Sequence, residues 1–271
     1  MLEVPTDLEF EQLQEFAREE TTTVDKSLLK YSHIPAGNGE SALDVAAVSG
    51  ALRLFPRDSL ELGLEVLNRD KETYVHAAAK HGHLHQIPEE LRIKSMLVAG
   101  TSGMTPLHYA AVSGSLHHVP SQLMTLNNLL LKDTQGWNVI HCAANNRNIY
   151  QIPPSMLTLK TLRIPTLSGD EYNAEGKNTV LHLLAKCGFL NELPEEFRSV
   201  ENFILDKDSA GKTPLEVVCE KRRLNYFLGQ QFSDAAKVLV SDKDWLCRNQ
   251  ELIDAKTKLE SQQAEFDVEL F

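Results

Sequence analysis

The chain has 271 residues, of which 42% are hydrophobic and 24% are charged, a composition typical of a soluble globular protein. Its formal net charge of −11 leaves no basic stripe to neutralise phosphates, which argues against nucleic acid as a partner. No apolar run is long enough to cross a bilayer, and the acidic N-terminus lacks a signal-peptide pattern, so we expect a cytoplasmic protein with no membrane partner.

The acidic residues are concentrated at the two ends of the chain. Residues 1–40 hold nine acidic and three basic residues, and residues 233–271 hold nine acidic and five basic ones. The middle holds twenty acidic and nineteen basic residues and is almost neutral. This distribution fits solvated caps at both ends, and it also fits an acidic docking surface.

The first predicted element is a helix over residues 6–20. Its apolar residues fall close to one helical face: Leu8, Phe10, Leu13, Phe16 and Ala17. We interpret residues 1–36 as an N-terminal helical cap, with a second short helix over residues 24–31. Residues 33–35, His-Ile-Pro, resemble the later His-x-x-Ile-Pro segments, so the cap could also be a degenerate extra repeat.

Two markers then recur along the chain with the same period. The first stands at Asp44, His76, His108, His141, His182 and Glu216, with separations of 32, 32, 33, 41 and 34 residues. The second stands at Pro56, Pro88, Pro120, Pro153 and Pro194, with separations of 32, 32, 33 and 41 residues. A period in the low thirties is typical of stacked repeats.

The best copy of the repeated motif is Thr-Pro-Leu-His-Tyr-Ala at residues 105–110. Thr105 suits a helix N-cap, Pro106 suits the first helical position, and Gly114 suits the helix end. Variants of the motif stand at residues 41–46, 73–78, 138–143, 179–184 and 213–218. The motif resembles the hallmark of the ankyrin repeat family, and the resemblance covers roughly residues 37–227.

This resemblance implies an all-α ankyrin repeat solenoid. It would consist of about six stacked helix-turn-helix units over residues 37–232, with helical N- and C-terminal caps over residues 1–36 and 233–271. The chain resembles the variant arrays of bacteria and their viruses more than metazoan ones, because the segment after each inner helix contains a proline. Since Pro88 and Pro194 lack an N–H and have a fixed φ, the outer helix should be short or broken there.

The connections between repeats are expected to be hairpin-like fingers. Asp133 with Gly136 and Asp208 with Gly211 supply turn chemistry. The spacing from His141 to His182 is eight or nine residues too long, and the surplus falls around residues 165–172. That enlarged finger is either a binding loop or a tolerated surface insertion.

Residues 233–271 are predicted to form an amphipathic helix and tail. Apolar residues recur there at intervals of seven: Val238, Trp245, Leu252 and Leu259. The helix could fold back on the last repeat, where Arg222 replaces the expected glycine, or it could pair with another chain. Polar residues at the intermediate positions weaken the coiled-coil alternative, and we expect a monomer.

The sequence contains little that could support catalysis or bind a metal. The four cysteines lie far apart and are interpreted as buried thiols, and no local motif supplies a nucleophile with its base. The calcium-like segment 206–211 lacks ligands at Ala210 and Val217. A second histidine group favours a solvated polar edge over zinc: His81, His83, His85, His117 and His118. We therefore predict no enzyme, no cofactor and no metal.

The resemblance implies a non-enzymatic scaffold that binds another protein through its concave face and fingers. The finger residues expected at this surface are Met104, Trp137, Asn178 and Lys212. The residues expected there from the inner helices are Lys80, His81, Tyr109, Asn145, Asn146 and Lys186. Trp137 is the leading candidate, because a large aromatic residue between Gly136 and Asn138 has little reason to be there for packing. The alternative is that Trp137 lies over the next finger as a local staple.

Two other functions remain open on the sequence. The chain could be a targeting or regulatory subunit of an enzyme. It could also be a secreted bacterial or viral effector or inhibitor that acts on a host protein. A repeat scaffold does not encode its partner in a motif, so the partner stays unidentified at this point.

Overall fold

The computed structural model describes residues 6–19, 24–36, 39–167, 176–198 and 200–220. Within these ranges the secondary structure is α-helix and 3-10 helix, with one isolated bridge between Lys132 and Asn138 and no strand. The predicted C-terminal helix over 233–271 and most of the enlarged finger lie outside the described residues. None of the described helices is long and apolar enough to cross a membrane.

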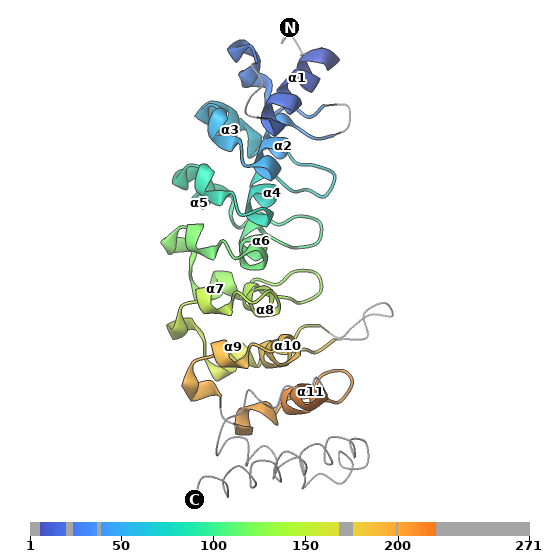
Figure 1. Cartoon of the computed structure of the whole chain (residues 1–271), viewed down its shortest axis with the longest axis vertical. Coiled ribbons are helices and arrows are strands. Elements are labelled where there is room, and N and C mark those ends of the chain that lie inside the picture. Colours follow the sequence, from blue (N-terminus) through green and yellow to red (C-terminus); the bar gives the residue numbers. More distant parts are fainter. Residues whose placement is uncertain (1–5, 20–23, 37–38, 168–175, 199, 221–271) are drawn as a thin grey trace, which may run out of the picture.

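The helices form two rows along one long axis, with the finger loops on the far side of the inner row (Figure 1). The inner row contains α1 (Asp7–Arg18), α2 (Ala42–Ser49), α4 (Tyr74–Lys80), α6 (Pro106–Ser113), α8 (Val139–Asn145), α10 (Val180–Cys187) and α11 (Pro214–Glu220). The α-helices of the outer row are α3 (Arg57–Gly63), α5 (Glu89–Ser95), α7 (Leu126–Leu129) and α9 (Leu159–Leu162).

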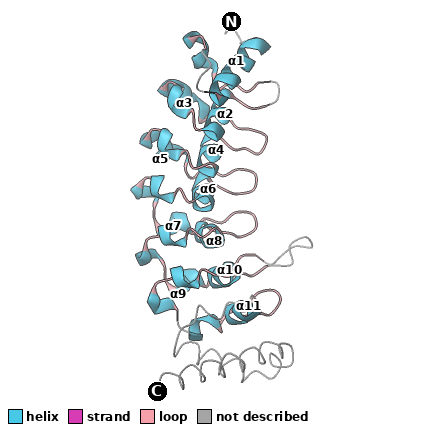
Figure 2. Ribbon diagram, viewed as in Figure 1, coloured by secondary structure: helices cyan, strands magenta, loops and turns pink. Residues whose placement is uncertain are grey.

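Short 3-10 helices complete each unit, as the many single cyan turns in Figure 2 show. Those that follow inner helices are η2 (Leu52–Leu54), η3 (Leu84–Gln86), η4 (Leu116–His118), η6 (Ile149–Gln151) and η8 (Leu190–Glu192). The others belong to the outer row: η1 (Lys26–Tyr31), η5 (Ser121–Leu123), η7 (Pro154–Met156), η9 (Glu195–Phe197) and η10 (Val200–Phe203).

The proline in each outer segment separates two short helical pieces, as predicted. In the second full unit, η3 ends one residue before Ile87, and Pro88 is the N-cap from which α5 starts. Proline cannot donate an i to i−4 hydrogen bond, so a continuous helix through residue 88 would lose a bond and clash. The acidic residues Glu89 and Glu90 then occupy the first turn of α5, where the helix dipole favours them.

Small residues on the inner helices allow neighbouring helices to pack closely. Each inner helix contacts the next one along the row, from α1 through α11. The paired alanines Ala110 and Ala111 in α6 are fully buried, as are Ala143 and Ala144 in α8. Because no single unit encloses its own apolar side chains, the core is continuous along the stack.

The N-terminal helix α1 occupies the position of an inner helix. It packs on α2 as α2 packs on α4. The hydroxyl of Ser49 donates to the carbonyl oxygen of Ala17, and the hydroxyl of Ser113 donates in the same way to Ala79, at 2.7 Å. Helix α1 therefore packs on α2 much as the later inner helices pack on one another, and whether residues 1–36 are a cap or a degenerate repeat stays open.

The fingers before α4, α8 and α11 are tight turns, each held by one Asn or Asp side chain. In the finger before α8, Asp133 Oδ1 accepts hydrogen bonds from the backbone N–H groups of Gln135 (2.9 Å) and Trp137 (2.8 Å). Gly136 adopts a positive φ of 78°, which a glycine tolerates at no steric cost. The N–H of Leu167 donates to the carbonyl oxygen of Gln135, so adjacent fingers are linked through their backbones.

Candidate partner-binding surface

The histidines at the recurring inner-helix position link neighbouring parts of the chain. His108 Nδ1 accepts a hydrogen bond from the backbone N–H of Thr105 at 3.2 Å, and its Nε2 donates to the carbonyl oxygen of Leu131 at 3.0 Å. Equivalent bonds to Val98, Ile164 and Lys212 are made by His76, His141 and His182. Because Nδ1 accepts, the proton resides on Nε2 and the ring is neutral. These four histidines therefore have a structural role.

Burial keeps these four imidazoles uncharged. It lowers the pKa of His76, His108 and His182, and it lowers the pKa of His141 to about 4. Each ring is at most 1% exposed, and both ring nitrogens already have hydrogen-bond partners. These histidines are therefore occupied by the fold and have no ring nitrogen left for acid–base chemistry.

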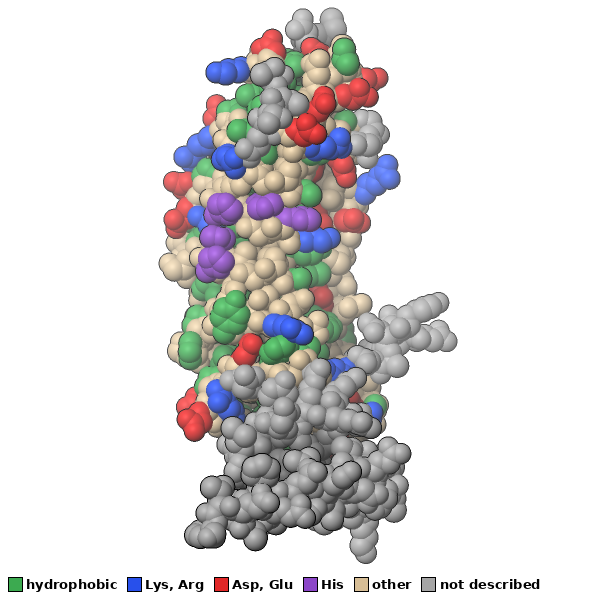
Figure 3. Space-filling model, in the orientation of Figure 1, with side chains coloured by type: hydrophobic (Ala, Val, Ile, Leu, Met, Phe, Trp, Pro, Cys, Tyr) green, Lys and Arg blue, Asp and Glu red, His purple; other side chains and the backbone are tan. Residues whose placement is uncertain are grey.

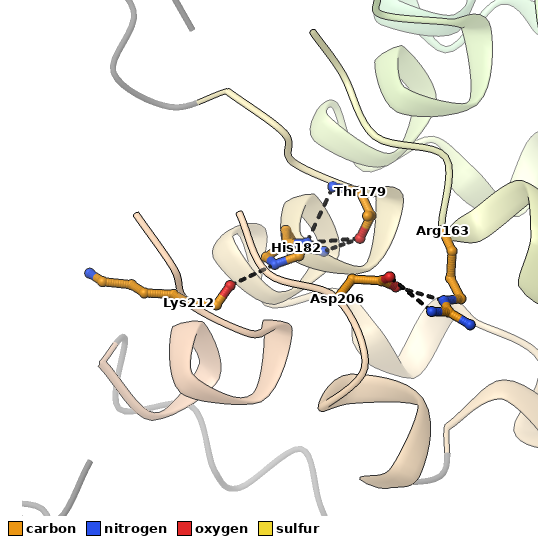
Figure 4. Close-up of polar contacts among 5 residues, drawn as sticks. All are labelled: Arg163, Thr179, His182, Asp206 and Lys212. Carbon is orange, nitrogen blue, oxygen red and sulfur yellow. Dashed lines mark hydrogen bonds and ion pairs between the residues drawn. The ribbon is translucent and has the colours of Figure 1, made fainter. Parts of the chain in front are cut away.

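The acidic residues of the calcium-like segment 206–211 have partners within the protein, and Figure 4 shows the ion pair of Asp206. The guanidinium of Arg163 donates two hydrogen bonds to the carboxylate of Asp206, at 2.7 and 2.9 Å. Asp208 Oδ1 accepts from the backbone N–H groups of Ala210 and Lys212. Both carboxylates therefore have local partners, a bidentate ion pair in one case and a finger turn in the other.

The predicted partner-binding residues differ in how far they are exposed. Three side chains are exposed: Lys80, His81 and Asn145. Six are half-buried: Met104, Tyr109, Trp137, Asn146, Lys186 and Lys212. Asn178 is only 2% exposed, so the expectation that it faces a partner is wrong. Its backbone N–H donates to Thr166 Oγ1 at the base of the enlarged finger, which holds the residue inside.

Tyr109 is the centre of a polar cluster that joins two units. Its hydroxyl donates to Glu72 Oε1 at 2.6 Å, and Lys80 Nζ lies 6.0 Å from the centre of its ring. Burial and the neighbouring Glu72 carboxylate raise the pKa of Tyr109, so the hydroxyl remains a donor. Glu72 was not among the residues predicted for this surface. It stands directly before Thr73, in the position that Met104 holds one period of 32 residues later.

Trp137 packs against the core as well as lining the finger. Its ring is half-buried, and its centre lies 6.1 Å from that of His141. The expectation that Trp137 has little packing role is therefore wrong: the ring covers the structural histidine of its own unit. Because it remains partly exposed, a partner could still contact it.

Two further sequence interpretations concern metals and thiols. His85 lies beside His118 of the next unit, with ring centres 5.1 Å apart. In the described part of the chain, no group of three or more His, Cys, Asp or Glu residues is placed to hold a metal ion. Cys142 is buried, and burial raises its pKa to about 12, so its thiol stays protonated.

The described residues thus form an all-helical protein of stacked helix pairs, with a row of finger turns beside a polar and aromatic surface. A scan against models of known protein families finds no match, and a search of curated proteins finds no similar protein. The interpretation of function therefore depends on the residues of this chain alone.

Proposed function

We propose that the chain is an ankyrin-like repeat solenoid that binds another protein through the concave face formed by its inner helices and fingers. The proposal is supported first by the recurrence of the motif with its period of 32 to 41 residues. It is supported further by the two rows of helices and by the backbone bonds between fingers, which hold successive units in a fixed register.

The observation that carries the proposal is the cluster of Tyr109, Glu72 and Lys80. It places a half-buried aromatic ring, an acid and a base on adjacent units, with the hydroxyl already hydrogen-bonded. A ring fixed in this way loses little conformational entropy on binding, and aromatic residues with ordered neighbours contribute strongly to interfaces. Asn145 extends this surface on α8 as an exposed side chain.

We propose no catalytic role, because the histidines buried at the recurring inner-helix position are engaged structurally. The four buried histidines use both ring nitrogens in hydrogen bonds, and the Cys142 thiol is protonated at neutral pH. We therefore propose a non-enzymatic scaffold. From the sequence alone we also propose that it is monomeric and cytoplasmic. A regulatory subunit or a secreted effector would use the same surface, and only the identity of the partner distinguishes these cases.

A photo-crosslinking experiment tests this surface directly. A benzoylphenylalanine residue is introduced in place of Asn145, and, as a matched control, in place of the exposed Lys160 on the outer helix α9. We expect the first to crosslink one protein in lysate of the source cells and the second to leave that protein uncrosslinked. Crosslinking of the same protein from position 160 alone would place the binding site on the outer row and refute the proposal.

The contribution of individual side chains is measured on the purified pair. Tyr109→Ala removes the ring at the centre of the cluster, whereas Tyr109→Phe removes only its hydroxyl. We expect the alanine variant to lose at least about tenfold in affinity, and the phenylalanine variant to lose less. Thermal melting of both variants shows whether the loss reflects binding or unfolding. Unchanged affinity in a folded Tyr109→Ala variant would remove this cluster from the interface.

A further inference from the structure

Histidine side chains gather on one face midway along the stack (Figure 3). We call this group the histidine patch, and its members are His81, His83, His85, His117 and His118. They follow α4 and α6 in two adjacent units, and three are exposed while His83 and His118 are half-buried. The ring centres of His117 and His118 lie 3.9 Å apart, and His83 lies 6.4 Å from His85.

The fold does not require histidine at most of these positions. The position of His85 and His117 holds Arg53 one unit earlier and Tyr150 one unit later. The position of His118 is taken by glutamine in other units, where the side-chain amides of Gln86 and Gln151 donate to the carbonyl oxygens of Gly50 and Gly114.

Among the members of the patch, His83 is the one whose ring forms a hydrogen bond with the backbone of the preceding unit. Its Nδ1 lies 2.9 Å from the carbonyl oxygen of Ala47, so it caps the end of α2. Units without the other histidines pack in the same way, so packing does not explain why five imidazoles occupy one face.

The charged groups around the patch oppose its protonation. Burial lowers the pKa of His118, and His117, His85 and Arg92 lower it further; Arg92 also donates to the carbonyl oxygen of His118 from α5. Burial, Lys80 and His83 lower the pKa of His81.

The neighbouring elements also contribute acids. Helix α5 carries Glu89 and Glu90, and Glu90 lies 3.7 Å from Arg57 of α3. Arg53 of η2 is turned to the carbonyl oxygen of Gly50. Because their pKa values are lowered, His81 and His118 are mainly uncharged near neutral pH. Any positive charge that they gain would be repelled by Lys80 and Arg92.

We propose that the histidine patch is a docking surface for an acidic peptide segment of a partner protein, and that docking takes up protons. Carboxylates placed against the patch would offset the mutual repulsion of the imidazoles and so favour their charged form. By linkage, a complex that binds more protons than its free components becomes tighter as the pH falls. The patch spans two adjacent units, which suits a short peptide segment.

This surface lies on the turns that follow the inner helices and shares only His81 with the concave face of the proposed function. The test depends on His85, His117 and His118, which are not part of that face. It is tested by fluorescence anisotropy with a labelled oligo-aspartate peptide, in EDTA, between about pH 7.5 and pH 5.5, a range that spans the usual histidine pKa. We expect affinity to rise at least tenfold on acidification. Calorimetry in two buffers of different ionisation enthalpy should count at least one proton taken up.

Three variants make the test specific. A variant with His85→Asn, His117→Asn and His118→Asn should lose the pH-dependent binding, while His83 is kept because it caps α2. A variant with His85→Lys and His117→Lys should bind the peptide at both pH values, since its charge is fixed. Tyr109→Phe, on the concave face, should behave as wild type, so that failure of one proposed surface is distinguishable from failure of the other.

Several outcomes would overturn the proposal. One is an affinity that does not change with pH, or one that the folded triple asparagine variant retains. A second is binding of the peptide only after Zn²⁺ replaces EDTA, which would make the patch a metal site. A third is tighter binding of oligouridylate than of oligo-aspartate at the same pH, which would indicate a nucleic-acid surface.

Discussion

At the scale of single residues, the histidine found at the recurring position in four units performs a task that the acidic residues at that position perform only in part. His141 accepts from the N–H of Asn138 at the start of α8 and donates to the carbonyl oxygen of Ile164. The acidic residues at the same position, Asp44 and Glu216, accept the N-cap N–H at 2.8 and 2.7 Å, but an ionised carboxylate has no proton to donate onward. The imidazole thus provides a link between neighbouring segments that the acids cannot complete.

Removing this link should be costly. His141→Ala leaves the Asn138 N–H and the Ile164 carbonyl without this partner in a fully buried site, and it also leaves a cavity. We expect a loss of about 3 kcal/mol in the free energy of unfolding, measured by urea denaturation. His117→Ala, at an exposed histidine, is the matched control and should change stability by less than about 0.5 kcal/mol. Equal effects at both sites would contradict the structural role of His141.

The buried histidines should also make stability depend on pH. Burial lowers the pKa of His141 from 6.5 to about 4, so between these values the unfolded chain binds more protons than the folded one. Its stabilising contribution is therefore complete above about pH 6.5 and is lost as the pH falls towards 4. His141 alone should account for about 2 kcal/mol of destabilisation at about pH 5. Urea denaturation at several pH values measures this, and His141→Gln should show a smaller dependence.

At the scale of elements, the backbones of neighbouring fingers can lie very close together. A Cβ on Gly136 would lie 2.6 Å from the backbone nitrogen of Leu167 in the next finger. A Cβ on Gly211 would meet nothing within 4 Å, although both glycines have a positive φ. The two sites therefore separate the cost of the backbone conformation from the cost of crowding.

Alanine substitution at these two glycines provides the test. Gly211→Ala should cost about 1 kcal/mol, the strain of a left-handed alanine. Gly136→Ala should cost at least about 1 kcal/mol more, because the backbone of Leu167 must move. Thermal and urea denaturation compare the two variants. If Gly211→Ala proved the more damaging, the close approach of the fingers would not determine stability.

At the scale of the whole molecule, the main contacts of each described inner helix are with its neighbours in the row. Helix α10 contacts α8 and α11, and α2 contacts α1 and α4. Because each unit is stabilised mainly by the units beside it, stability should be distributed along the stack rather than shared equally.

Hydrogen exchange should reveal this distribution. Leu184 of α10 is fully buried, and Leu184→Ala should cost about 2–5 kcal/mol locally. We expect protection to fall most in α8, α10 and α11 and least in α1 and α2. Leu43→Ala in α2, equally buried, should give the reverse gradient. A uniform loss of protection in both variants would indicate that the chain unfolds as one cooperative unit.

Local chemistry, read along the sequence, determined much of this protein. The caps at Thr73 and Thr105, the break at Pro88 and the turn at Asp133 depend on backbone rules that act within a few residues. The sequence also shows the recurrence of the histidines, because each stands at the same position of its motif.

Tertiary structure alone decided which side chains are buried and which ones meet. Asn178 and Trp137 stand in finger positions by period, yet one is enclosed at the base of the enlarged finger and the other covers His141. Glu72 meets Tyr109, and His85 meets His118, across a distance of 33 to 37 residues in the chain. Such contacts depend on the offset between stacked units and on the rotamers that packing allows, and neither quantity is set by the repeat period.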